Sequence, residues 1–297
     1  MLSKTVEPAS IEDIILSHDN RGISGLRPFL PPSHCEDAAR FILDTKTGLN
    51  RVALITTGFY ISAAQAAETD GPPGAIALAG ALESLDFELV YVTDRYGIPL
   101  LSCARPGPEN VIEFPITDHE TSSGFARRLL ADVRPAIIIA IERCGFTSDK
   151  RYLNMRGVDI SDFTAKVDYL FLEQDNTLGI GDGGNEIGMG NLAARIREMP
   201  NLPDDPAETR TRKLVISSVS NWGAYGLVAA LSLLCQRDLL PSVQWEKDLL
   251  ADMVATGAVD GVTGERKCAV DAFDLEQNAW ALTQLKRLVQ RDAAFRP

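Results

Sequence analysis

Short apolar runs alternate with stretches of helical spacing along most of this chain, and this alternation is the feature that most constrains its fold. The apolar runs are too short for helices, so each predicts a buried strand. Strands are expected at 51–57, 88–93, 111–116, 135–141 and 213–219. Helices are expected at 35–44, 73–85, 122–133, 222–235 and 275–289. Because strands that alternate with helices build parallel sheets, we predict an α/β fold, a mostly parallel sheet with helices on both faces.

Two stretches that contain several prolines, 97–110 and 197–212, predict surface loops. Neither is long enough to link two domains, and the sequence contains no internal repeat. We therefore predict a single α/β domain over residues 1–297, with a small secondary lobe left open.

An excess of acidic residues limits the partners of this protein. Its 29 Lys and Arg against 41 Asp and Glu give a net charge of −12, which repels nucleic acid and anionic membrane surfaces. No apolar stretch reaches the ~20 residues that a membrane-spanning helix needs. The five cysteines lack C-x-x-C spacing, and residues 1–10 do not resemble a secretory signal. We expect a cytoplasmic protein with a small-molecule partner; a mitochondrial location and the oligomeric state are left open.

Hydrogen-bonding and charged residues follow several of the predicted strands. In an open parallel sheet, ligands bind beyond the carboxyl ends of the strands, where loops and helix N-termini meet. These positions therefore predict a shared cleft, although strand ends also carry polar residues simply because the chain emerges into water. The residues concerned are Thr57, Gly58, Glu142, Arg143, Asn221 and Trp222.

The segment 179–190 holds six of the chain's 23 glycines. Such density indicates backbone that adopts positive φ or approaches another group closely. Gly179, Gly181 and Gly184 formally satisfy the dinucleotide-binding pattern G-x-G-x-x-G. Asp182 argues against that function, because an anion inside the loop would repel a pyrophosphate.

A helix that begins near Gly183 would place Asp182, Asn185 and Glu186 on one face. These three side chains could then hold a divalent cation, Mg²⁺ or Mn²⁺, or shift one another's pKa for acid/base chemistry. The alternative is structural: Asp182 would cap the helix and Glu186 would complement its dipole. The sequence leaves both alternatives open, and a divalent cation is retained as the candidate cofactor.

Basic residues gather at Arg143 and over 150–156, against the acidic character of the chain. Arginines in such a cluster suit the capture of a small carboxylate, whereas a solvated charged face is the alternative. Glu68 and Asp70 precede a predicted helix that begins at Pro72-Pro73. Helix capping explains Asp70 but not Glu68.

Taken together, these motifs resemble the D-glutamate cyclase family, in particular its C-terminal domain, over roughly residues 10–290. The matching segments are Thr57-Gly58-Phe59, 68–75, Glu142-Arg143, 154–157, 179–190, 220–223 and 260–264. Two positions depart from the pattern, because Cys144 stands where proline is expected and Asp271-Ala272 where Asp-Gly is expected. The resemblance implies an α/β lyase that closes D-glutamate to 5-oxo-D-proline with loss of water.

On this resemblance we assign roles to the residues singled out above. One carboxylate would take the proton of the substrate ammonium and arginines would bind the two substrate carboxylates. The catalytic candidates are Glu142, Asp182 and Glu186, and the candidate metal ligands are Asp182, Asn185 and Glu186. The substrate-binding candidates are Thr57, Gly58, Glu68, Asp70, Arg143, Asn154, Arg156, Asn185, Asn221 and Trp222. The alternatives are metal-dependent hydrolysis or elimination on another small amino or oxo acid, and non-catalytic carboxylate binding.

Overall fold

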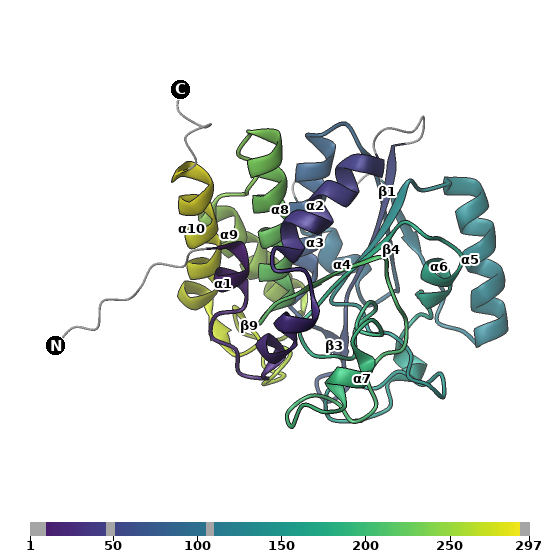
Figure 1. Ribbon diagram of the computed structural model, residues 1–297. Coiled ribbons are helices and arrows are strands. Elements are labelled where there is room, and N and C mark those ends of the chain that lie inside the picture. Colours follow the sequence, from purple (N-terminus) through teal and green to yellow (C-terminus); the bar gives the residue numbers. More distant parts are fainter. Residues whose placement is uncertain (1–9, 46–50, 105–109, 292–297) are drawn as a thin grey trace.

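A six-stranded parallel sheet forms the centre of the computed structural model, which describes residues 10–45, 51–104 and 110–291 (Figure 1). Across the sheet the strand order is β5-β4-β1-β6-β7-β8, and every pairing is parallel. The strands are β1 (Val52–Thr57), β4 (Glu88–Thr93), β5 (Val111–Glu113), β6 (Ile137–Ile141), β7 (Thr177–Gly181) and β8 (Lys213–Ile216). The predicted α/β fold is confirmed.

The order of the strands reverses between β1 and β6. From β1 the chain adds strands outward to β5, and from β6 it adds strands outward in the opposite direction to β8. A crevice opens at such a point, because the connections on its two sides lead away from each other. Thr57 pairs with Ile141 across it, so Gly58 and Glu142 leave the sheet side by side.

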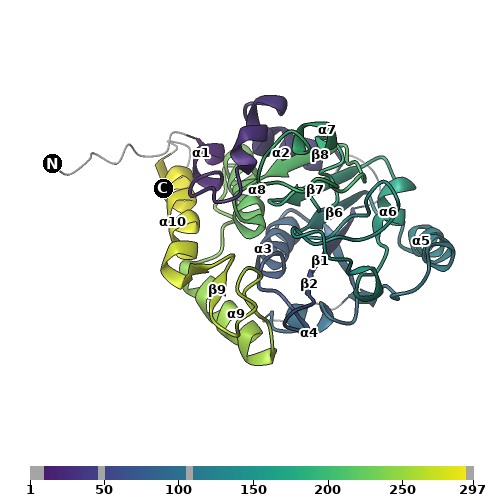
Figure 2. The ribbon, with the colours of Figure 1, turned by 90° about the horizontal axis from the view of Figure 1, so that it is seen from below.

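Helices cover both faces of the sheet (Figures 1 and 2). One face carries α1 (Ile11–Ile15), α2 (His34–Thr45), α3 (Pro72–Glu83), α8 (Ser220–Cys235) and α10 (Leu275–Arg291), with α9 (Val243–Thr256) beside α10. The other face carries α5 (His119–Val133) and α6 (Asp168–Leu172). Helix α8 is apolar on nearly all sides, because α1, α2, α3 and α10 surround it.

The two faces of the sheet have separate apolar cores, which is why the strands read as nearly continuous apolar runs. All five residues of β6 are buried. Ile137, Ile139 and Ile141 pack toward α3 and α8, whereas Ile138 and Ala140 pack toward α5 and α6. Among the described residues, no helix has both the length and the apolar composition for crossing a bilayer.

Small elements surround the carboxyl edge of the sheet. Two antiparallel hairpins pair β2 (Tyr60–Ile61) with β3 (Ala66–Ala67), and β9 (Ala269–Val270) with β10 (Phe273–Asp274). The short helices are α4 (Ile98–Leu101), α7 (Ala193–Ile196), η1 (Ile23–Phe29) and η2 (Ser161–Phe163). The first hairpin leads into Glu68, and the second turns at Asp271, so both bring carboxylates toward this edge.

Four features of the fold differ from the sequence predictions. The glycine-rich segment begins with the buried strand β7, and a Cβ on Gly179 would lie 2.4 Å from the carbonyl oxygen of Ile187. No helix begins near Gly183; residues 182–192 form an irregular loop, so that prediction was wrong. Helix α9 was not predicted. In the surface loop expected at 97–110, α4 forms a short helix, and residues 105–109 lie outside the described part.

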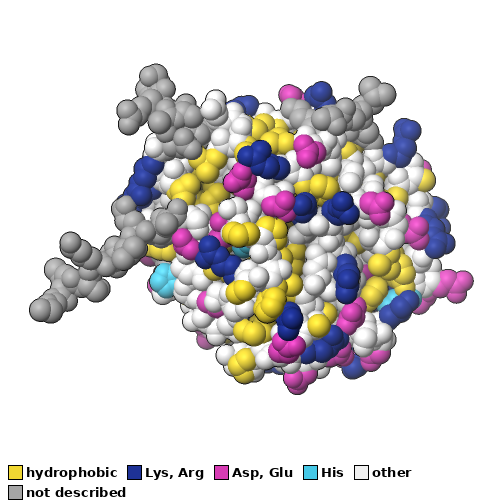
Figure 3. Space-filling view, viewed as in Figure 1, with side chains coloured by type: hydrophobic (Ala, Val, Ile, Leu, Met, Phe, Trp, Pro, Cys, Tyr) yellow, Lys and Arg dark blue, Asp and Glu magenta, His cyan; other side chains and the backbone are white. Residues whose placement is uncertain are grey.

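Basic and acidic side chains are interspersed on the molecular face shown in Figure 3. A cluster of like charge lies in the interior, at the carboxyl edge of the sheet. There Glu68, Asp70, Glu142, Asp182 and Glu186 are each at most 6% exposed.

Candidate active site

A cavity of about 260 Å³ lies beyond the carboxyl ends of β1, β6 and β7. Its charged lining comprises three carboxylates, Glu68, Glu142 and Asp182, and two guanidinium groups, Arg21 and Arg156. Its remaining lining is formed by Phe59, Ile61, Ser62, Ala63, Asn154, Met155, Asn185 and residues 261–264. Segments that are far apart in the sequence therefore converge on one hollow, although Glu142 is the only one of the six strand-end residues named above that lines it.

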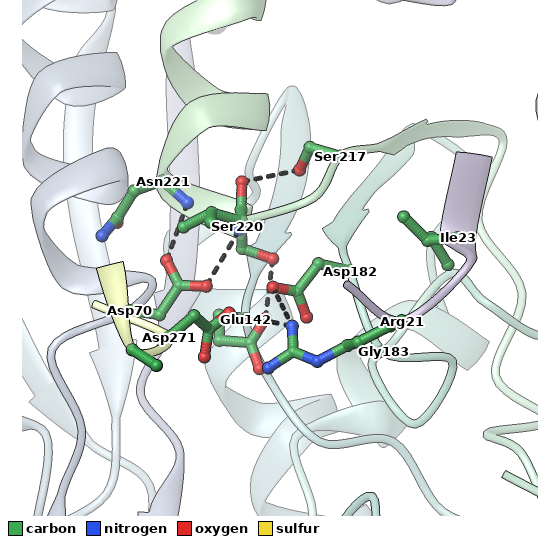
Figure 4. A network of polar contacts seen from close by, with 12 residues as sticks. Arg21, Ile23, Asp70, Glu142, Asp182, Gly183, Ser217, Ser220, Asn221 and Asp271 are labelled. Carbon is green, nitrogen blue, oxygen red and sulfur yellow. Dashed lines mark hydrogen bonds and ion pairs between the residues drawn. The ribbon is translucent and has the colours of Figure 1, made fainter. Parts of the chain in front are cut away.

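Glu142 leaves β6 in an unusual backbone conformation. Its φ of 45° lies in the left-handed region, which a residue with a Cβ adopts at a cost. The hydroxyl of Ser220 donates a hydrogen bond to its Oε2 at 2.6 Å (Figure 4). Burial, and then the neighbouring carboxylates of Glu186 and Asp70, raise the pKa of Glu142 well above its ordinary value.

Asp70 and Asn221 cap each other's helices. The Asp70 carboxylate accepts hydrogen bonds from the backbone N–H groups of Ser220 at 2.9 Å and Asn221 at 2.8 Å, in the first turn of α8. In return, Asn221 Oδ1 accepts from the N–H groups of Gly71 at 3.0 Å and Gly74 at 2.8 Å, at the start of α3. Burial raises the pKa of Asp70 to about 7, against the effect of these N–H donors. Asp70 therefore caps α8 and not α3, the helix that the sequence analysis expected it to cap.

Arg21 joins two carboxylates that are far from it in the sequence. Its Nη1 lies 2.6 Å from Asp182 Oδ2 and 2.8 Å from Asp271 Oδ2 (Figure 4). Sequence analysis identified neither Arg21 nor Asp271 as a site residue. Asp271 follows the segment with family resemblance at 260–264, which could have drawn attention to it. No local pattern singles out Arg21, because its partners lie more than 150 residues away along the chain.

Glu186 organises the glycine-rich loop without a helix. Its Oε1 accepts a hydrogen bond from the N–H of Gly183 and its Oε2 accepts one from the N–H of Gly184, both at 2.8 Å. These bonds replace the predicted helical pattern. The loop nevertheless brings carboxylate oxygens of Glu142, Asp182 and Glu186 within 4.8 Å of one another. Burial raises the pKa of both Asp182 and Glu186.

The two arginines expected to bind substrate occupy different environments. Arg143 is 1% exposed, donates to Asp94 at 2.6 Å and to the carbonyl oxygen of Gly58 at 2.8 Å, and does not line the cavity. Arg156 is exposed and lines the cavity. Asn154 supports it, because its Oδ1 accepts from the backbone N–H of Arg156 at 2.9 Å.

The remaining substrate-binding candidates also fall into two groups, those that line the cavity and those that are buried away from it. Glu68, Asn154 and Asn185 line the cavity together with Arg156. Trp222 is fully buried beside Phe273 and donates to Asn278 at 3.2 Å, in the core behind the site. The candidates that are buried without lining the cavity are Thr57, Gly58, Asp70, Arg143, Asn221 and Trp222.

With this geometry established, comparison with known proteins identifies the family. Residues 11–286 match the family described as D-glutamate cyclase-like, C-terminal. The chain belongs to this family. The family resemblance noted in the sequence is thus confirmed.

Relatives of this family include a human protein named D-glutamate cyclase, mitochondrial. It is 34% identical over 203 residues, which cover 62% of this chain and 33% of the human protein. The chain thus spans about a third of the length of that relative. A solved structure, an exopolyphosphatase-related protein from Bacteroides fragilis, matches with 10% identity and a TM-score of 0.45, over 88% of this chain and 60% of that one.

Proposed function

We propose that this protein closes D-glutamate to 5-oxo-D-proline with loss of water. One observation carries the proposal: a single cavity combines three buried carboxylates with the guanidinium groups of Arg21 and Arg156. A substrate with one ammonium and two carboxylate groups is complementary to that combination. Membership of the D-glutamate cyclase-like family supports the same substrate class and a hydro-lyase reaction.

The two arginines suit the two substrate carboxylates. Arg156 stands at the exposed side of the cavity and Arg21 at its inner side, where Asp182 and Asp271 hold it. Guanidinium groups pair with carboxylates through directed N–H bonds, so two of them fix the length and direction of a diacid. We assign the reacting γ-carboxylate to Arg21, where positive charge also stabilises the negative charge that develops on its oxygens.

Glu68 is the best placed proton carrier. It lines the cavity, and no described side chain or backbone N–H donates to its carboxylate, whereas Glu142 accepts from Ser220 and Asp182 pairs with Arg21. Burial, with help from Asp271 and Asp70, raises the pKa of Glu68 well above its ordinary value. A carboxylate of this kind accepts a proton from an ammonium group far more readily than an exposed one.

The proton balance of the reaction closes within the cavity. Ring closure forms one N–C bond, breaks one C–O bond, and converts an ammonium and a carboxylate into an amide and water. Two protons leave the nitrogen and two arrive on the departing oxygen. Glu68 can carry each in turn, and a carboxyl that accepts and returns protons requires no further reagent. Holding both ends of the substrate also supplies the orientation that an intramolecular closure needs.

The test is direct turnover by the purified full chain. Separate incubations with D- and L-glutamate are followed by chiral chromatography of 5-oxoproline, with heat-denatured protein as the blank. We expect product from the D enantiomer. A folded protein that forms no product from either enantiomer contradicts the proposal, and a rise in melting temperature with D-glutamate under those conditions would identify a non-catalytic carboxylate-binding protein.

A further inference from the structure

Asp182 belongs to two groups of carboxylates, which differ in their ion pairs with basic side chains. Oxygens of Asp70, Asp182 and Asp271 lie within 4.8 Å of one another, and Arg21 forms ion pairs with two of the three. The second group, which we call the loop triad, comprises Glu142, Asp182 and Glu186, with the same spacing. Within the described part of the chain, no basic side chain forms an ion pair with Glu142 or Glu186.

An unpartnered amide oxygen lies beside the loop triad. Asn185 is 3% exposed, and its Oδ1 accepts no hydrogen bond from any described residue, whereas its Nδ2 donates to the carbonyl oxygen of Leu153 at 3.1 Å. That bond fixes the direction of the amide, and Asn185 lines the same cavity as Glu142 and Asp182. A buried acceptor without a donor costs about 1–3 kcal/mol, so its retention calls for a ligand.

Glycine keeps the space between these oxygens open. A Cβ on Gly183 would lie 2.7 Å from Glu186 Oε1, 2.8 Å from Asn185 Oδ1 and 2.6 Å from the sulfur of Met155, so both oxygens border the same small volume beside that thioether. Each oxygen of Glu186 accepts one backbone N–H, and a carboxylate oxygen has a further lone pair for another partner.

We propose that Glu142, Asp182, Glu186 and the Oδ1 of Asn185 bind a divalent cation of the Mg²⁺ or Mn²⁺ class. All four donors are oxygen, without a thiolate or imidazole, and carboxylate and amide oxygens are the ligands of hard cations. The site differs from the one expected from the sequence, because a loop rather than a helix assembles it and because Glu142 joins it from β6. The proposed cation site goes beyond the proposed cyclisation, and cation binding there does not depend on which reaction the protein catalyses.

The experiment measures binding of Mn²⁺ alone to the purified full chain after treatment with EDTA and dialysis. Free Mn²⁺ is followed by electron paramagnetic resonance during titration, without any amino acid present. Glu142→Gln removes one negative charge from the proposed ligand set with little change in size, and Asn185→Ala removes the amide oxygen. His34→Gln is the matched control, because Glu12, His34 and Cys35 form another buried group with metal-ligand spacing on α1 and α2.

We expect one Mn²⁺ per chain in the wild type, a dissociation constant at least tenfold weaker in both cavity variants, and an unchanged constant in His34→Gln. Each cavity variant should show a cooperative melting transition, which establishes that it is folded, and Mn²⁺ should raise the melting temperature of the wild type more than that of either variant. Absence of Mn²⁺ binding at millimolar concentration, equal binding by the wild type and both cavity variants, or loss of binding in His34→Gln overturns the proposal. Because no substrate is present, these outcomes are independent of whether D-glutamate is turned over.

Discussion

The guanidinium of Arg143 donates to the carboxylate of Asp94 at 2.6 Å, and both side chains are at least 95% buried. Arg143 also donates to the carbonyl oxygens of Gly58 and Ala165, so it joins the ends of β1, β4 and β6. Arg143→Met would leave the Asp94 charge buried without its partner. We expect it to lower the free energy of unfolding by about 3–5 kcal/mol.

Denaturation in urea measures this loss, with Arg127→Met as the control. Arg127 pairs with Glu173 at 2.9 Å on the surface, and such exposed pairs contribute only about 0–1 kcal/mol. Equal changes in the free energy of unfolding for the two variants would show that the buried pair contributes no more to stability than the exposed pair.

Glu68→Gln should remove turnover while preserving the fold. The amide cannot accept the ammonium proton, and loss of a general base lowers the rate by about 10²–10⁴-fold. The variant should melt no lower than the wild type, because the substitution removes a carboxylate from among other buried carboxylates. Initial rates with D-glutamate and thermal unfolding test both points. Glu265→Gln, at an exposed position beyond the cavity, is the control, and comparable rates for both variants would exclude Glu68 as the proton carrier.

Arg156→Met should weaken substrate binding more than it slows the chemical step. Arg156 lines the cavity from an exposed loop, and a charge-assisted hydrogen bond contributes about 1.5–3 kcal/mol. We expect KM for D-glutamate to rise at least tenfold with a smaller change in kcat. Arg151→Met, on the same segment but outside the cavity lining, should leave KM unchanged. A KM that responds equally to both substitutions would point to a general effect of surface charge.

The sheet could be predicted from the sequence because its strands are buried on both faces and therefore read as apolar runs. Strand β7 was not predicted, and the reason is physical. Its Gly179 and Gly181 carry no side chain, which lets residues 186–188 pack against the strand. The same two glycines interrupt the run of apolar side chains by which a buried strand is recognised in a sequence. The strand and the loop that follows it were therefore read together as one glycine-rich loop.

The site was predictable where it depends on strand ends and not where it depends on partners distant in sequence. Glu142 directly follows a predicted strand, so the topology places it at the carboxyl edge. Asp182 was singled out from the glycine-rich segment instead, because the strand before it was not predicted. The environment of Arg143 is decided by Asp94, which follows β4 on the far side of β1, and no local pattern reveals that pairing. Arg21 reaches the site only through its contacts with Asp182 and Asp271, and sequence periodicity carries no information about them.

Ala272→Gly should stabilise the protein. Ala272 has a φ of 65°, in the left-handed region that disfavours a Cβ, and it occupies the position where the family pattern predicts glycine. Relief of that cost, about 1–2 kcal/mol, exceeds the added entropy of glycine in the unfolded chain. We expect a melting temperature higher by about 2 °C. Ala251→Gly, in the interior of α9, should instead lower stability by about 1 kcal/mol, and a shift in the same direction for both variants would contradict this account.

Glu246 should make stability depend on pH at a position remote from the cavity. Burial between α8 and α9 raises its pKa from the ordinary 4.5 to about 7, and the nearby Tyr225 only partly offsets this. The folded state thus binds a proton more tightly than the unfolded state, so the contribution of Glu246 is fully present below about pH 4.5 and is lost as pH rises through 7. A shift of this size corresponds to roughly 3 kcal/mol.

Glu246→Gln removes the titrating group and isolates its contribution from those of the other buried carboxylates. We expect the variant to match the wild type near pH 5 and to exceed its stability at pH 8, because only the wild type then holds a buried charge on α9. Urea denaturation at half-unit intervals of pH measures the difference between the two proteins. Glu120→Gln, at an exposed position of α5, is the control for the chemical change itself. A stability difference between Glu246→Gln and the wild type that does not change with pH would contradict this account. Glu246 would then have to be ionised in the folded protein throughout the range, and its burial would not make stability depend on pH.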